Sequence, residues 1–335
     1  MKEATYVDGM LVDWGASLFN LNPPKKAPQT ASRAGASLIP RPPKGGAGMA
    51  REIGADAKEI RAKLGLLVKR APEVMVKVSG AGRGMRQIKA HIDYISRDGQ
   101  LEAEDQDGNP LKGKDDLSDL RGEWADGGFP LDDESERRDA FNIVLSMPKG
   151  TDALAVKRAA RDFAMREFAD HQYVMVLHTF ETDPDPEPSE HPHVHLCVKA
   201  VALDGVRLNP RKADLQRWRE GFARALREHG VEAAATTRTQ RLQRQRAEKQ
   251  AVRQMRDRGV RPTRIGLAPT DEGRVARARA IQSQVLKNYE GIVKALASSE
   301  KAEDRALANG VMNYLSQTLL QDQERDRVPD RGRSR

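Results

Sequence analysis

The chain has 335 residues, a formal net charge of +8 and an isoelectric point near 9.5, which favours negatively charged partners such as nucleic acids. Apolar residues make up 38% of the chain, aromatic residues 4% and charged residues 32%, so one modest core with long polar extensions is expected rather than one compact globule. The single cysteine, Cys197, excludes an internal disulfide framework, and neither a membrane span nor a secretion peptide is recognisable.

Charge is segregated along the chain. Residues 98–139 carry fifteen acidic and five basic side chains, whereas residues 236–266 carry ten basic and two acidic ones. The basic stretch, which we expect to form a helix over 238–264, is therefore a candidate for binding nucleic acid or phosphate. The alternative is a charged helix whose side chains are solvated.

The first part of the chain predicts few regular elements. Residues 1–50 are rich in alanine, glycine and proline and show no sustained periodicity, which is typical of a flexible extension. A short helix is expected at about 55–69, followed by an apolar strand at 74–78 and a glycine-broken loop at 79–84. This loop is not a P-loop, because it lacks the GK[ST] ending.

A helix is expected to follow this loop. An apolar stripe at spacings of three, four and three defines its buried face, formed by Met85, Ile88, Ile92 and Ile95. Tyr94 lies off this stripe at about 100° per residue and is expected to point well away from the core.

Arginines fall on the tyrosine's side of this helix, namely Arg83, Arg86 and Arg97 if the helix extends that far. A tyrosine surrounded by arginines is suited to meet a phosphate. The alternative is an ordinary boundary tyrosine on an amphipathic helix.

The middle of the chain alternates strands and helices after an acidic connection at 98–139. The expected elements are a strand at 141–147, a helix at about 152–169, a strand at 173–180, an acidic proline-rich loop at 181–190, a strand at 193–203, a short hairpin partner at 206–208 and a helix beginning at Asn209-Pro210. This order predicts an α+β fold, in which helices pack on one face of a central, mainly antiparallel sheet and the other face carries the site.

Two histidines in the strand at 193–203 form the strongest local motif. Alternate residues of a strand face the same way, so His193 and His195 present two imidazoles side by side, and such a pair is able to hold one metal ion. His178, at the end of the preceding apolar strand, is the candidate third ligand because an antiparallel neighbour would lie beside the pair. The alternative is two polar residues on a wet face. Cys197 shares the parity of the pair and is more simply a half-buried thiol.

Three segments in a fixed order carry a family resemblance. They are the tyrosine segment at 91–99 after a strand, His178 with the run at 191–195, and the segment at 236–241. Together they resemble the relaxases of conjugative and mobilisable plasmids, specifically the mobilisation (MobP) branch of the HUH endonucleases that includes the T-DNA border nickase. The resemblance covers about residues 72–245.

The resemblance implies a reaction and assigns residues to it. Tyr94 would attack a phosphodiester of single-stranded DNA and form a 5′-phosphotyrosyl protein and a free 3′-hydroxyl, while His178, His193 and His195 hold a divalent cation against the phosphate. The family uses Mg²⁺ or Mn²⁺, whereas three imidazoles alone suggest zinc, and purified protein is able to carry Zn²⁺. His191 is expected to orient a ligand through a hydrogen bond.

One departure concerns the acid that accompanies the first histidine. Fourteen residues separate His178 from His193, and Phe180 stands where relatives carry an acid. Glu181 is the expected substitute, with Asp183 or Asp185 of the inserted loop as alternatives. The loop is also a candidate electrostatic gate above the DNA entrance.

The resemblance also implies partners and an organisation. The expected partners are single-stranded DNA with an adjacent hairpin at an origin of transfer, accessory relaxosome proteins and a type IV coupling protein, in the bacterial cytoplasm and with transfer to the recipient on the DNA. The expected DNA contacts are Arg83, Arg86, Arg97, Lys199, Arg238 and Arg241. The expected parts are a flexible extension at 1–50, the relaxase nuclease domain at 51–245, a charged helical region at 246–320 and a disordered tail at 321–335.

Two other functions are compatible with these motifs. A DNA-binding or regulatory protein with a degenerate nuclease site is favoured by the lengthened spacing after His178. A replication initiator of the same superfamily is disfavoured, because initiators usually place the tyrosine after the histidine motif.

Overall fold

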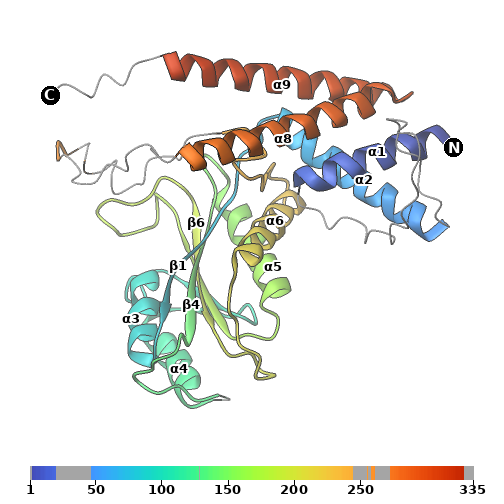
Figure 1. Cartoon of the computed structure of the whole chain (residues 1–335). Coiled ribbons are helices and arrows are strands. Elements are labelled where there is room, and N and C mark those ends of the chain that lie inside the picture. Colours follow the sequence, from blue (N-terminus) through green and yellow to red (C-terminus); the bar gives the residue numbers. More distant parts are fainter. Residues whose placement is uncertain are drawn as a thin grey trace. The chain divides into compact units, whose positions relative to one another are not determined.

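The computed structural model describes residues 2–19, 47–127, 129–243, 255, 258–260 and 272–327 (Figure 1). The chain divides into two compact units. One unit is continuous and spans residues 71–235, and the other combines the segments before residue 71 with those after residue 235. None of the described helices is long and apolar enough to cross a membrane.

The continuous unit is built on an antiparallel sheet. Within the described residues its strands run in the order β1-β4-β6-β5-β2-β3, and each neighbouring pair is antiparallel. Figure 1 shows β1, β4 and β6 side by side. The strands are β1 (Met75–Gly82), β2 (Ala103–Asp105), β3 (Pro110–Leu111), β4 (Ala140–Ser146), β5 (Tyr173–His178) and β6 (His193–Lys199). The predicted α+β fold with a central antiparallel sheet is confirmed.

One face of the sheet is covered by two helices, α5 (Ala153–Glu167) and α6 (Lys212–Glu228). Alternate residues of each central strand point into this core, such as Val194, Leu196 and Val198 of β6, all fully buried. Because the period of a strand is two, the other parity of β6, which includes both histidines of the motif, faces the opposite side.

Helices also cover part of that opposite face, whereas the sequence predicted helices on one face (Figure 1). The predicted helix is α3 (Met85–Ser96), and its apolar stripe packs with a second helix, α4 (Gly113–Asp126), against β5 and β6. The helix α4 lies in the segment expected to be a connection. Its buried residues recur at spacings of three and four, at Leu117, Leu120 and Trp124, but they stand among many acidic residues that obscured the pattern.

Two predicted boundaries near α6 also differ. The expected strand 206–208 is reduced to an isolated bridge between Val201 and Arg207. The helix does not begin at Asn209-Pro210 but at Lys212, after Arg211, whose backbone N–H donates to Asp214 Oδ2 at 2.8 Å. This carboxylate accepts from the N-cap N–H and stabilises the start of the helix.

The other unit is helical. Its helices are α1 (Lys2–Phe19), α2 (Ala47–Val68), α8 (Glu272–Ala297) and α9 (Ala302–Arg327), and they share one apolar cluster. Buried members at helical spacing, such as Leu11, Ile60, Leu64, Ile292 and Val311, come from both ends of the chain.

This unit changes the expected organisation. The segment 1–50, expected as a flexible extension, contains all of α1, and α2, expected within the nuclease domain, packs with the C-terminal helices. The helix α9 continues past residue 321 to Arg327, where a disordered tail was expected. The physical reason is that α1 and α2 pack on each other and also on α8 and α9, which lie more than 200 residues away, and local periodicity cannot show such partners. Most of the basic stretch 238–264 lies outside the described residues.

An ion pair joins α2 to α9 and tests this helical unit. Arg61 donates from Nε and Nη2 to both carboxylate oxygens of Asp304 at 2.7 and 2.9 Å, and Ser299 Oγ donates to the same carboxylate at 2.7 Å. The Asp304 side chain is 4% exposed. Arg61 Nη1 also pairs with Asp8 Oδ1 at 2.8 Å. We expect Asp304→Ala to lower the free energy of unfolding by about 2 kcal/mol, because the guanidinium then keeps only Asp8 and the Ser299 hydroxyl loses its acceptor. Urea denaturation followed by circular dichroism measures this, with Glu290→Gln, at an exposed position of α8, as a control that should not change the midpoint.

Candidate active site

Three imidazoles meet where β5 ends and β6 begins. His178 is paired with His193 in the register of the two strands, and His195 follows on the same face of β6. The ring centroids lie 4.7 Å apart for His178 and His195, and 5.1 Å apart for each of the other two pairs. One nitrogen from each ring lies within 4.8 Å of the others, so the three are able to share one cation.

Burial favours the neutral form of the two β6 rings, His193 and His195. It lowers the pKa of His195 to about 2, with the neighbouring imidazoles adding to the effect, and it lowers the pKa of His193. In the described part of the chain, His195 Nδ1 is buried without a hydrogen-bond partner. Neutral rings with an unpaired buried nitrogen suit a cation, because a metal ligand must offer a lone pair.

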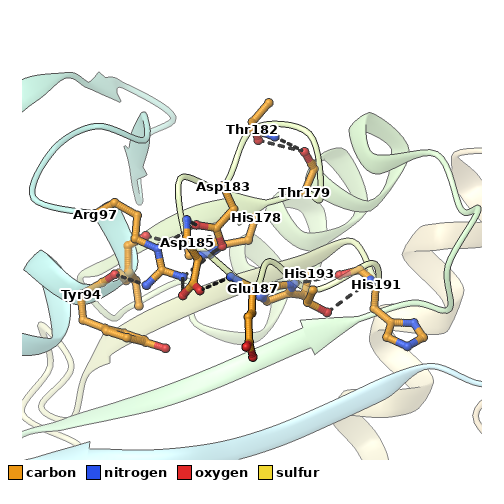
Figure 2. A network of polar contacts seen from close by, with 12 residues as sticks. Tyr94, Arg97, His178, Thr179, Thr182, Asp183, Asp185, Glu187, His191 and His193 are labelled. Atoms are coloured by element: carbon orange, nitrogen blue, oxygen red, sulfur yellow. Dashed lines mark hydrogen bonds and ion pairs between the residues drawn. The ribbon is translucent and has the colours of Figure 1, made fainter.

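His178 is held on both sides. Its Nδ1 lies 2.8 Å from Asp183 Oδ2 (Figure 2). Its Nε2 lies 2.6 Å from the backbone oxygen of Ile95 at the end of α3. The Ile95 carbonyl stands in the last turn of α3, where the N–H of Gly99 donates to Ser96 Oγ instead of continuing the helical ladder. A cation on Nε2 would take the place of the contact with Ile95.

The carboxylate that accompanies His178 is Asp183, whereas Glu181 was the expected acid. Glu181 is exposed, and the loop turns so that the Asp183 N–H donates to the Thr179 oxygen at 3.1 Å. The side chain of Asp183 is thereby brought back over His178 (Figure 2). The Arg97 guanidinium beside it holds the pKa of Asp183 well below its usual range.

His193 is oriented by the backbone of His191 rather than by its ring. His193 Nδ1 lies 2.8 Å from the His191 oxygen, which leaves Nε2 for the cluster. The ring of His191 is exposed and points away in Figure 2, and its Nδ1 accepts from the Lys149 N–H at 3.0 Å. The expected ring-mediated hydrogen bond from His191 to a ligand is therefore absent from this geometry.

Tyr94 stands beside the cluster on α3. Its side chain is 58% exposed, and its ring centroid lies 6.4 Å from that of His195, edge to face. His91, one turn earlier on α3, lies 6.4 Å from each of these two rings. Sequence reasoning missed His91, although its spacing of three from Tyr94 puts both on one side of the helix. Burial lowers the pKa of His91 to about 4.

The arginines of α3 divide into two sets. Arg83 and Arg86 are exposed at the start of the helix, where Arg86 pairs with Glu134 at 2.8 Å. Eight residues of helical rise put Arg86 about 12 Å along the axis from Tyr94. Arg97 was expected to contact DNA, but its side chain is 15% exposed and engaged with Asp183 and Asp185. Two carboxylates already compensate its charge, so it is not open to a phosphate.

Lys199 was also expected to contact DNA, and its burial contradicts this. The side chain is 1% exposed, and Nζ donates to the backbone oxygens of Trp124 and Gly127 at 3.2 and 3.4 Å and to Gln172 Oε1 at 3.1 Å. Burial lowers the pKa of Lys199. Through these three acceptors Lys199 links β6 to the end of α4 by hydrogen bonds.

Lys199→Met tests this assignment. We expect the variant to lose about 2 kcal/mol of unfolding free energy, because buried carbonyl oxygens lose their donor. Affinity for single-stranded DNA, measured by fluorescence anisotropy at a temperature where the variant is folded, should stay unchanged. Weaker DNA binding with wild-type stability would restore the original assignment.

The two remaining expected DNA contacts lie in the helical unit. Arg238 is exposed. Arg241 is half-buried and donates from Nη1 to the backbone oxygen of Thr236 at 2.6 Å and to its hydroxyl at 2.9 Å.

The antiparallel sheet carries three clustered histidines and an adjacent exposed tyrosine, and one known family matches this part of the chain. Residues 97–231 match the family model "Relaxase: MobA/VirD2-like, nuclease domain". The match supports a relaxase nuclease domain of the HUH superfamily in this part of the chain. The match includes the three histidines and begins three residues after Tyr94. No curated protein matches the chain.

Proposed function

We propose that this protein nicks and rejoins one strand of DNA at an origin of transfer through a 5′-phosphotyrosyl intermediate on Tyr94. The observation that carries the proposal is the exposed Tyr94 ring beside His195, next to three imidazoles able to share a cation. The helix α3 has to bury its apolar stripe against the sheet, so Tyr94, off the stripe, is presented at the histidine face.

The reaction is a transesterification. The oxygen of Tyr94 bonds to phosphorus as the bond from phosphorus to the 3′ oxygen breaks, the phenol gives up its proton, and the 3′ oxygen takes one up. The phosphotyrosyl bond retains the energy of the phosphodiester, so the same site is able to rejoin the strand. An ordinary tyrosine has a pKa near 10, so a base or nearby positive charge is needed to generate the attacking phenolate.

His178, His193 and His195 would hold the cation, which when bound neutralises charge on the nonbridging phosphate oxygens. The half-buried rings of His193 and His195, whose pKa values burial lowers, and the carboxylate behind His178 fit such a group. We propose Mg²⁺ or Mn²⁺ as the working ion, because phosphate oxygens and waters complete its shell, and Zn²⁺ as an ion carried from purification.

The open part of the histidine face supplies a surface for DNA that the sequence did not indicate. Lys77 on β1 is exposed and lies in register with Val144 of β4, which in turn is in register with His195. Two strand spacings separate the backbones of Lys77 and His195 by about 10 Å. A lysine at that distance is suited to a phosphate next to the scissile one. Arg83 and Arg86 would serve DNA further along α3.

Initiation of conjugative transfer follows from this reaction. A covalent attachment to the 5′ end would allow the strand to be led, with the protein, to a type IV coupling protein and into a recipient cell. Accessory relaxosome proteins would open the origin, and the hairpin beside the nick would be read as a folded DNA element. The charged segments around Arg238 are the proposed DNA contacts outside the nuclease domain.

A covalent adduct tests the proposal. The full chain is incubated with Mn²⁺ and labelled single-stranded oligonucleotides that tile the candidate origins of its own mobile element, and the products are separated on a denaturing gel. We expect a protein-linked label and a free 3′-hydroxyl fragment, and loss of both with a chelator. DNA binding without any adduct in Mg²⁺, Mn²⁺ and Zn²⁺ would instead favour a DNA-binding protein with a degenerate site.

A further inference from the structure

The inserted loop between β5 and β6 is fastened to the end of α3 by one arginine. Arg97 Nε and Nη2 donate to the two oxygens of Asp183 at 2.8 and 3.0 Å, and Nη2 also donates to Asp185 at 3.1 Å (Figure 2). The side chain of Asp183 is 4% exposed, so this pair is shielded from water. A bidentate arginine–carboxylate contact of this kind fixes both the distance and the plane of the carboxylate.

The same arginine contacts the tyrosine. The centre of the Arg97 guanidinium lies 4.8 Å from the centroid of the Tyr94 ring, and Nη1 donates to the Tyr94 backbone oxygen at 3.1 Å. Arg97 follows the last helical residue and has a left-handed φ of 52°, which turns its side chain back along α3. This conformation lets one residue reach both Tyr94 and the loop.

Asp183 passes the constraint on to the histidine cluster. Its Oδ2 atom is shared, since Arg97 Nη2 and His178 Nδ1 both lie within 3.0 Å of it. The carboxylate cannot rotate without losing one of these contacts. His178 is therefore held between a carbonyl of α3 on one side and the loop on the other.

We propose that Arg97 is a positioning residue, which fixes His178 for the cation through Asp183 and at the same time supports the Tyr94 ring. The inference rests on the proposed function in that the three histidines bind a divalent cation. It makes the inserted loop a structural part of the site and not an electrostatic gate, because Asp183 and Asp185 point inward to Arg97. Asp183 takes the place of the acid that relatives carry at the position of Phe180, and Arg97 holds Asp183 there.

The test compares Arg97→Ala, Arg97→Lys and Asp183→Asn with a matched control in the full chain. The control is Arg161→Ala, which breaks another bidentate ion pair, that of Arg161 with Glu104. The Glu104 side chain is 4% exposed, as is that of Asp183. Mn²⁺ affinity is measured by calorimetry, with Tyr94→Phe present in every variant so that no cleavage occurs. Circular dichroism verifies that each variant is folded.

We expect Arg97→Ala and Asp183→Asn each to weaken Mn²⁺ binding about 10- to 100-fold, as loss of an outer contact to a metal ligand does. Arg97→Lys should not rescue it, because lysine keeps the charge but lacks the planar fork. Arg161→Ala should keep the wild-type affinity even if it lowers stability. The double variant of Arg97 and Asp183 should be no weaker than the single ones, since both break the same link.

A second measurement needs no metal. In the ¹⁵N spectrum of the histidine rings, the His178 signals should shift in Arg97→Ala, while those of His229, which pairs with Asp162, should stay in place. Wild-type Mn²⁺ affinity and unshifted His178 signals in Arg97→Ala would overturn the inference. Rescue by lysine would do so too. If the wild-type chain binds no Mn²⁺ but the His178 signals shift in Arg97→Ala as expected, the positioning role stands and the cation site of the proposed function is contradicted.

Discussion

Tyr94→Phe is expected to reduce formation of the covalent DNA adduct by at least about 1,000-fold. The variant lacks the attacking oxygen, and we expect no neighbouring group to replace it. The phenyl ring keeps the contact with the Arg97 guanidinium and the position beside His195. Affinity for Mn²⁺ and for single-stranded DNA should therefore stay within a few-fold of the wild type. The adduct is quantified on a denaturing gel and both affinities by titration.

The matched control is Tyr173→Phe. Tyr173 is 2% exposed in the core beneath the other face of the sheet, and burial raises its pKa to about 12, so it is unsuited to attack DNA. This variant should form the adduct at the wild-type rate once folded. If the adduct survives in Tyr94→Phe and disappears in Tyr173→Phe, the nucleophile has been assigned to the wrong tyrosine.

His195→Ala is expected to weaken Mn²⁺ binding by at least about 100-fold, because it removes a proposed metal ligand. Loss of a residue that only contacts a ligand typically weakens binding about 10- to 100-fold. His195 lies between the other two imidazoles and Tyr94, and its buried Nδ1 has no partner in the described residues. The variant should also lose the adduct, as should the wild type in the presence of a chelator. Calorimetry with Mn²⁺ and the gel assay measure the two effects.

His229→Ala controls for the removal of a histidine as such. His229 follows the end of α6 and its Nε2 lies 2.9 Å from Asp162, away from the histidine face. Its Mn²⁺ affinity and adduct yield should equal those of the wild type. An adduct that forms in His195→Ala, or in chelator with wild-type protein, would show that the reaction does not depend on this cation site.

The sequence predicted the parts of the site that depend on local periodicity. The period of two in a strand put His193 and His195 on one face, and the stripe from Met85 to Ile95 fixed which side of α3 carries Tyr94. Both predictions use only spacing along one element. The fold class followed in the same way, because the order of strands and helices limits how an apolar face is buried.

Contacts between distant segments could be decided only by the tertiary structure. The sequence favoured Glu181 as the acid, with Asp183 as an alternative, and the turn of the loop and the position of Arg97 place Asp183 against His178 instead. Lys199 lies on the same face of β6 as the histidines, but the end of α4 covers that part of the strand. Lys199 is therefore buried and donates a hydrogen bond to α4. The helices at both ends of the chain likewise needed the fold to identify their partners. Periodicity determines which face of an element is buried, and only packing determines what covers it.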